Sequence, residues 1–138
     1  MARSTVRFAL IVVLCACSSP TEPFSRQVTL TTMMSWYAPG ATLSAALVNR
    51  SGSEIGYGDC SLTLERLDGT QWEGAGPEPR PCLSLLNVVA PGRATMMQFV
   101  LDRTLVQGIY RLRQEIMPGT SLPYALIRST KFEVGWPP

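Results

Sequence analysis

Histidine is absent from the 138 residues of this chain, and lysine occurs once, at Lys131. The absence of histidine excludes Ser-His-Asp and Cys-His nucleophile systems and every histidine-ligated metal site. A serine-lysine pair would have to use Lys131, which lies in an alternating segment that we interpret as a surface strand. No phosphate-binding glycine loop and no EF-hand spacing occurs in the sequence. We therefore expect a protein that is not an enzyme, with no cofactor and no metal site.

Carboxylates gather in one part of the sequence, but the pattern gives each an ordinary explanation. A paired-carboxylate hydrolase needs two acids that converge on a cleft with separated pKa values. Glu65 falls on the polar side of an alternating segment, and Asp68 belongs to a turn. The pattern does not decide whether a carboxylate-bearing loop binds calcium. The acids concerned are Asp59, Glu65, Asp68, Glu73 and Glu78.

The chain also lacks an apolar run long enough to span a bilayer, because the run at residues 8–14 is far shorter than the ~20 residues required. Arg3 and Arg7 precede this run, as in a secretion signal. The segment Leu14-Cys15-Ala16-Cys17 resembles the bacterial lipobox. Ala16 is a smaller residue than Leu14, so cleavage before Cys17 is favoured over cleavage before Cys15. We predict a lipoprotein signal peptide at 1–16 and acylation of Cys17. The acyl chains on Cys17 would anchor the protein to membrane lipid, its predicted membrane partner. The alternative is an ordinary cleaved signal peptide.

The predicted leader accounts for the basic excess of the chain. Loss of Arg3 and Arg7 leaves as many basic as acidic residues. No cluster of basic residues with interleaved aromatics occurs, so we expect no nucleic-acid partner. The predicted location is the bacterial cell envelope. Ser18 is not the aspartate that retains many lipoproteins in inner membranes, which favours the outer membrane.

Composition divides the exported part into three segments. Residues 17–26 contain Pro20 and Pro23 among polar residues and are predicted to be a flexible tether. Residues 27–134 have the size of one domain. Residues 135–138 form a short C-terminal tail that contains Trp136.

Hydrophobic residues in the domain alternate with polar ones, which indicates half-buried strands. Turn signals separate the alternating segments, and Asp68-Gly69 predicts a hairpin with a type I′ turn. No convincing amphipathic helix occurs. The pattern predicts an all-β, antiparallel sandwich of about seven strands. The predicted strands lie at 28–34, 42–47, 61–67, 70–73, 95–101, 109–116 and 131–134.

Several of these motifs occur in an order that resembles bacterial immunoglobulin-like domains of secreted and lipid-anchored proteins. They are Tyr37-Ala-Pro-Gly40, Ile55-Gly-Tyr-Gly58, residues 62–67 with Asp68-Gly69 and Trp72, Pro91-Gly92, and Gly108-Ile-Tyr-Arg-Leu112. The resemblance implies an immunoglobulin-like β-sandwich that serves as an adhesive, structural or accessory module. It also implies that Tyr110 is a structural corner, with its hydroxyl bonded to upstream backbone and its ring in the core.

Two cysteines remain in the domain if Cys15 leaves with the leader and Cys17 carries lipid. A cysteine pair in an exported domain suggests a disulfide, so we predict a Cys60–Cys82 bond. A reactive thiol pair is the alternative, although the spacing is not Cys-x-x-Cys and no histidine can activate either thiol.

Aromatic residues beside turns are the candidate contact residues for a partner, which we expect to be an envelope protein or a glycan. Trp36 and Tyr37 precede the Pro39-Gly40 turn and are the candidate binding residues. Trp72 is assigned to packing. One methionine of each pair, Met33-Met34 and Met96-Met97, is expected in the core. We predict a non-catalytic binding or accessory module; the alternatives are a β-sandwich proteinase inhibitor and a carbohydrate or cell-wall binding module.

Overall fold

The computed structural model describes residues 24–76, 86–119 and 123–136 of the chain, and most of these residues lie in β-strands. A short helix, α1 (Phe24–Gln27), precedes the first strand, and a 3-10 turn, η1 (Asp59–Ser61), lies between β4 and β5. The strands are β1 (Val28–Thr32), β2 (Trp36–Tyr37), β3 (Thr42–Asn49), β4 (Ile55–Tyr57), β5 (Thr63–Asp68), β6 (Gln71–Gly74), β7 (Asn87–Val89), β8 (Ala94–Val100), β9 (Gly108–Pro118), β10 (Ala125–Arg128) and β11 (Phe132–Val134).

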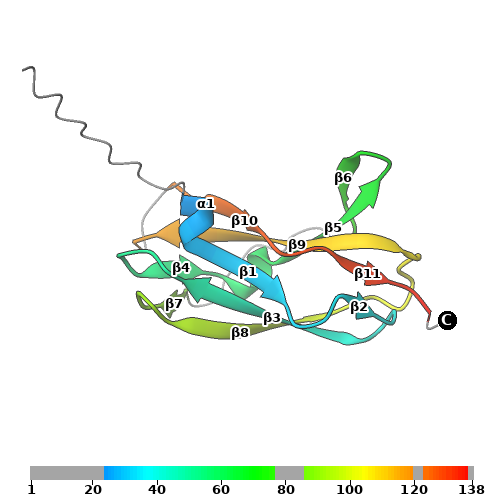
Figure 1. Cartoon of the computed structure of the whole chain (residues 1–138), viewed down its shortest axis with the longest axis horizontal. Coiled ribbons are helices and arrows are strands. Elements are labelled where there is room, and N and C mark those ends of the chain that lie inside the picture. Colours follow the sequence, from blue (N-terminus) through cyan, green and yellow to red (C-terminus); the bar gives the residue numbers. More distant parts are fainter. Residues whose placement is uncertain (1–23, 77–85, 120–122, 137–138) are drawn as a thin grey trace, which may run out of the picture.

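The strands form two sheets that pack face to face (Figure 1). The first sheet has the order β1-β3-β8. The second has the order β2-β11-β9-β4-β7, and β10 and the β5–β6 hairpin also join it through β9. The arrangement is the immunoglobulin-like β-sandwich that the sequence predicts.

Strand β9 organises the second sheet because its 11 residues are long enough to pair with four other strands. β11 and β10 lie in succession along one edge of β9, and β5 and β4 lie along the other. Tyr110, Leu112 and Ile116 alternate along β9 and are fully buried between the sheets. Gln114, on the same side, is the polar exception and donates to the carbonyl oxygen of Gly58 at 3.1 Å.

All seven predicted strands are present in the structure, as β1, β3, β5, β6, β8, β9 and β11. The described residues contain four further strands, β2, β4, β7 and β10, which have only two to four residues each. Segments of this length are too short to show an alternating pattern. The prediction of a purely antiparallel sandwich is wrong for one pair, because β2 runs parallel to β11. Residues 33–35 carry the chain from the first sheet to the second before β2 begins.

The turns agree closely with the sequence. The predicted hairpin joins β5 to β6, and Gly69 has φ +57°. Because Asp68 pairs with Gln71, the two central residues of the turn are Gly69 and Thr70, one position later than the predicted Asp68-Gly69 pair. Gly40 and Gly92, which follow Pro39 and Pro91, also have positive φ values of 82° and 70°. Glycine adopts this left-handed backbone without the steric cost that a Cβ would bring.

Asn49 closes the end of β3 through its side chain and is fully buried. Its amide nitrogen donates to the carbonyl oxygens of Ser53 and Val89, at 2.8 and 2.9 Å. Its amide oxygen accepts hydrogen bonds from the backbone nitrogen and hydroxyl of Ser51, at 3.0 and 2.6 Å. One side chain therefore holds the turn after β3 and ties it to β7.

Two predictions near the sandwich surface need correction. Residues 24–26 were assigned to the tether, but Phe24 is half-buried against the core, so the packed part of the chain begins at least three residues earlier than predicted. Met33 and Met34 are both exposed because they occupy the bend between β1 and β2, so neither fills the core. Met97 is buried and Met96 is exposed, as predicted for the second pair.

Candidate functional site

The two candidate binding aromatics differ from their prediction. Tyr37 is only 1% exposed, and its ring meets Phe132 edge to face with the centroids 5.4 Å apart. Its hydroxyl accepts a hydrogen bond from the backbone nitrogen of Met34 at 3.0 Å. The prediction that Tyr37 is a contact residue is wrong, because the pairing of β2 with β11 turns this side chain into the core. Trp36 is half-buried beside it, so the pair does not form an exposed aromatic platform.

Tyr110 has the geometry of a tyrosine corner. Its side chain is fully buried, and its hydroxyl donates to the carbonyl oxygen of Val106, four residues upstream, at 2.6 Å. The ring stacks on Phe132 with the centroids 6.2 Å apart. Burial raises the pKa of Tyr110 above its ordinary value, an effect that the nearby positive charge of Arg66 partly offsets.

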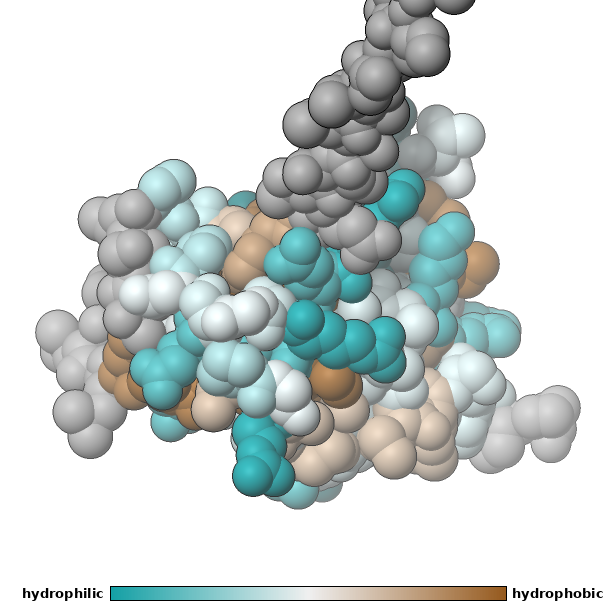
Figure 2. All heavy atoms as spheres, turned by 60° about the vertical axis from the view of Figure 1, so that its left-hand side comes forward, coloured by the Kyte–Doolittle hydropathy of each residue, from teal (hydrophilic) through white to brown (hydrophobic). Residues whose placement is uncertain are grey.

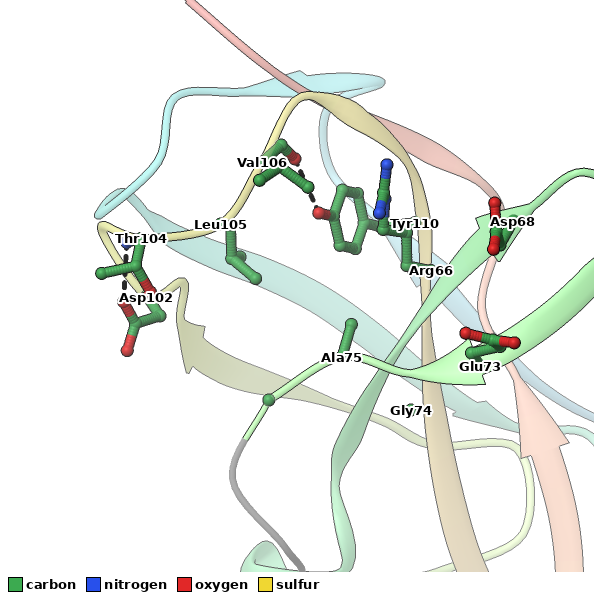
Figure 3. A pocket seen from close by; sticks show the side chains of 11 residues that line it. Arg66, Asp68, Glu73, Gly74, Ala75, Asp102, Thr104, Leu105, Val106 and Tyr110 are labelled. Carbon is green, nitrogen blue, oxygen red and sulfur yellow. Dashed lines mark hydrogen bonds between the residues drawn. The ribbon is translucent and has the colours of Figure 1, made fainter.

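A pocket of about 530 Å³ lies between the β5–β6 hairpin and the segment that joins β8 to β9 (Figure 3). Asp68 and Glu73 line it from the hairpin, and Asp102 and Leu105 line it from the joining segment. Tyr110 reaches it from β9. The corner bond of Tyr110 therefore fixes the segment that forms one wall of this pocket.

Charge in the pocket lining is predominantly negative. Asp68, Glu73 and Asp102 contribute three carboxylates, against the single guanidinium of Arg66. Asp102 accepts hydrogen bonds from the hydroxyl and the backbone nitrogen of Thr104, each at 2.7 Å. These bonds lower the pKa of Asp102, the hydroxyl bond having the larger effect, so this carboxylate is ionised at neutral pH.

Arg66 occupies an unusual position for a charged residue. It lies on β5 two residues after buried Leu64, so alternation directs it to the inner side of the sheet. Its Nε is buried and has no hydrogen-bond partner among the described residues. A Cβ at Gly108 would approach this Nε to 3.0 Å, so the glycine leaves room for the guanidinium beside β9. The sequence contained this signal, because Arg66 follows Leu62 and Leu64 in the inward-facing series.

The outer surface of the second sheet holds a separate polar cluster. Glu65 accepts a hydrogen bond from Nε of Arg111 at 2.6 Å and lies 3.7 Å from Nε of Arg128. Glu65 lies on the polar face of β5 that the alternation predicts, but it is only 8% exposed because Arg111 and Arg128 lie against it. Arg111 covers the ring of Trp72, with Cζ 3.9 Å from the ring centroid. This contact accords with the packing role predicted for Trp72.

The predicted lipidation and disulfide sites are described only in part. Cys60 lies in η1, and Leu62 separates this turn from β5. Its predicted partner Cys82 lies outside the described residues, as do the leader at 1–16 and Cys17. The disulfide and the lipid anchor therefore stay predictions.

The described residues contain neither a metal-ligand cluster nor a membrane-spanning helix. No group of three or more His, Cys, Asp or Glu side chains in this part of the chain is placed to hold a metal ion. Across residues 24–76, 86–119 and 123–136, no helix has the length and apolar character that membrane crossing requires.

Comparison with known proteins gives matches among solved structures alone. No protein-family model matches the chain, and no curated protein matches it. Among solved structures, the chain is similar to an ASH/PapD-like domain of human CEP192, with 14% identity and a TM-score of 0.39 over 96% of this chain and 94% of that one. It is also similar to part of a β-glucosidase from Listeria innocua solved with gluconolactone, with 15% identity and a TM-score of 0.36. That match covers 85% of this chain and 18% of the glucosidase.

Proposed function

We propose that this protein is a lipid-anchored, non-catalytic binding module of the bacterial cell envelope. The lipobox-like segment Leu14-Cys15-Ala16-Cys17 supports the anchor, with acylated Cys17 as the point of attachment. The immunoglobulin-like sandwich is a scaffold on which contact residues are supported by rigid strands. In an oxidising compartment, Cys60 and Cys82 would form a disulfide.

We further propose that the partner binds at the pocket between the β5–β6 hairpin and the β8–β9 segment. This pocket is the observation that carries the proposal, because it combines a volume of about 530 Å³ with charged groups from separate segments. Its three carboxylates favour a partner group that donates hydrogen bonds or carries positive charge. An envelope protein with basic side chains fits this description better than a neutral glycan stacked on aromatics, since Tyr37 is buried.

Site-specific photo-cross-linking in living cells tests the pocket as a binding site. The photoreactive residue p-benzoylphenylalanine would replace Glu73, which lines the pocket, in the full-length chain. Glu54 is the matched control, because it is exposed and its backbone bonds to Gly119, beyond the opposite end of β9.

We expect a cross-linked product of defined mass from position 73 and none from position 54. Absence of a product at position 73, or the same product from both positions, would contradict the proposed site. Mass spectrometry of the product would identify the partner class, and a heterogeneous glycan adduct would favour the cell-wall alternative.

A further inference from the structure

Strand β8 forms an open edge of the first sheet, because it pairs with β3 and with no other described strand. At one end, the carbonyl oxygen of Arg93 accepts a hydrogen bond from the backbone nitrogen of Asn49 at 2.9 Å. At the other end, the backbone nitrogen of Leu101 donates to the carbonyl oxygen of Ala41 at 3.0 Å. In an antiparallel strand, the N–H and C=O groups of successive residues point to opposite sides of the strand. The backbone groups of the odd-numbered residues of β8 therefore bond to β3, and those of the even-numbered residues point toward the open edge. Those edge-facing residues are all exposed: Ala94, Met96, Gln98 and Val100.

The other sheet edges in the described part of the chain are short or already bonded. β2, β6 and β7 have two, four and three residues, and β6 carries Glu73. On the far side of β1, the carbonyl of Leu30 accepts a hydrogen bond from Thr130 at 3.3 Å. Proteins protect exposed edges by short length, charge or proline. β8 has seven residues and contains neither a charged residue nor a proline.

The outer surface of the β1-β3-β8 sheet is also free of charge. The strand registers place its residues in rows, of which Thr31, Ala46 and Met96 form one. In Figure 2, light-brown side chains gather along the lower side of the molecule, where Figure 1 places β3 and β8. Met96 and Val100 are 54% and 70% exposed on this surface. The surface consists of Thr29, Thr31, Thr42, Ser44, Ala46, Val48, Ala94, Met96, Gln98 and Val100.

We propose that β8 pairs antiparallel with β8 of a second copy of this chain, which joins the two three-stranded sheets into one. Hydrogen bonds form across this junction only if the even-numbered residues of one β8 lie opposite even-numbered residues of the other. A two-fold axis through Met97 places all four even-numbered residues in such pairs. Ala94 then faces Val100 of the second copy, and Met96 faces Gln98.

The edge is complementary to itself in charge as well as in hydrogen bonding. All facing residues are uncharged, so the pairing brings no like charges together. Arg93 precedes the strand, and Asp102 and Arg103 follow it. The side chain of Arg103 lies against Gly40, in the turn before β3, so antiparallel pairing brings Arg93 of one copy near Asp102 of the other. These features favour a second copy over an unrelated strand as the occupant.

Cysteine cross-linking of the full-length protein in membranes tests the pairing. The double variant Met96→Cys/Gln98→Cys places thiols opposite each other across the proposed junction, where Cα atoms lie about 5.5 Å apart. Both side chains are exposed, so the fold should tolerate the change. Thr29→Cys/Thr31→Cys is the matched control on the same uncharged surface, two strands away from the open edge. The parent chain gives the background from its native cysteines.

We expect a dimer of twice the chain mass after oxidation of the β8 variant, with only background cross-linking in the β1 control. Equal cross-linking of both variants would indicate stacking of sheet faces and overturn the proposal, as would adducts of any other mass. A second variant, Met96→Lys/Gln98→Lys, should weaken self-association of the detergent-solubilised protein at least tenfold in sedimentation experiments. Unchanged association of that variant, a parent that sediments as a monomer, or a β8 cysteine variant that gives no dimer on oxidation would also overturn the pairing.

Discussion

Replacement of Tyr110 by phenylalanine isolates the contribution of the corner hydrogen bond to the fold. The ring and its stacking on Phe132 are retained, whereas the 2.6 Å bond to the carbonyl of Val106 is lost. A hydrogen bond contributes about 0.5–1.5 kcal/mol net, and a buried acceptor left without its donor raises the cost to as much as ~3 kcal/mol. The carbonyl lies at a partly buried position, so we expect a loss of about 1–2 kcal/mol in the free energy of unfolding.

Urea denaturation of the purified protein measures this loss, and thermal denaturation should show a melting temperature lower by roughly 5–10 °C. Tyr124→Phe is the matched control because Tyr124 is 57% exposed, so its stability should stay within about 0.5 kcal/mol of the parent. A Tyr110→Phe protein as stable as the parent would refute the assignment of a stabilising corner bond.

The same variant should change the response of stability to alkaline pH. Because burial raises the pKa of Tyr110 in the folded state, the unfolded chain releases the phenolic proton first as pH rises. The stabilising contribution is therefore present below the ordinary tyrosine pKa of about 10 and is lost as pH rises through the folded value. Tyr110→Phe should show a shallower decline in unfolding free energy above that pH than the parent, and identical slopes would contradict the linkage.

Substitutions at three further positions test other parts of the fold by the same denaturation measurement. Asn49→Ala removes four hydrogen bonds from a fully buried side chain and should cost about 3 kcal/mol; a loss below 1 kcal/mol would contradict its role in closing β3. Glu65→Gln weakens the ion pair with Arg111 and should lower the free energy of unfolding by about 1–2 kcal/mol. An unchanged free energy of unfolding would show that the pair makes no net contribution to stability. Gly69→Ala should lower the free energy of unfolding by about 1 kcal/mol. The cause is the positive φ alone, since no atom lies within 4 Å of the added Cβ. Gly69→Asn should recover part of this loss, because asparagine tolerates positive φ better than alanine.

Features of the fold that depend on neighbouring residues in sequence could be predicted. Alternation located the long strands, and Asp68-Gly69 located the hairpin, because each pattern reflects local backbone geometry. Tyr37 could not be placed correctly, because its burial depends on pairing between Trp36-Tyr37 and residues 133–134, which lie 97 residues further along the chain. The burial of Glu65 could not be predicted for the same reason, since Arg111 and Arg128 reach it from two other strands.

The candidate site was less predictable than the fold. Its pocket is assembled from a hairpin and a connecting segment that are separated in sequence, and no motif marks either. Arg66 was the available signal, as a charged residue in an inward-facing series, but its meaning depends on the space beside Gly108. Tyr110 was found through its resemblance to the corner of immunoglobulin-like sandwiches, and the pocket wall that it fixes is evident only in three dimensions.

Intact-mass spectrometry of the mature protein from the membrane fraction tests most directly whether the domain works at a lipid surface. We expect an N-terminus at Cys17 that carries acyl chains, and we expect Cys17→Ser to shift the protein out of the membrane fraction. An unacylated mature N-terminus, or membrane association that survives Cys17→Ser, would contradict the lipid-anchored binding module proposed for this chain.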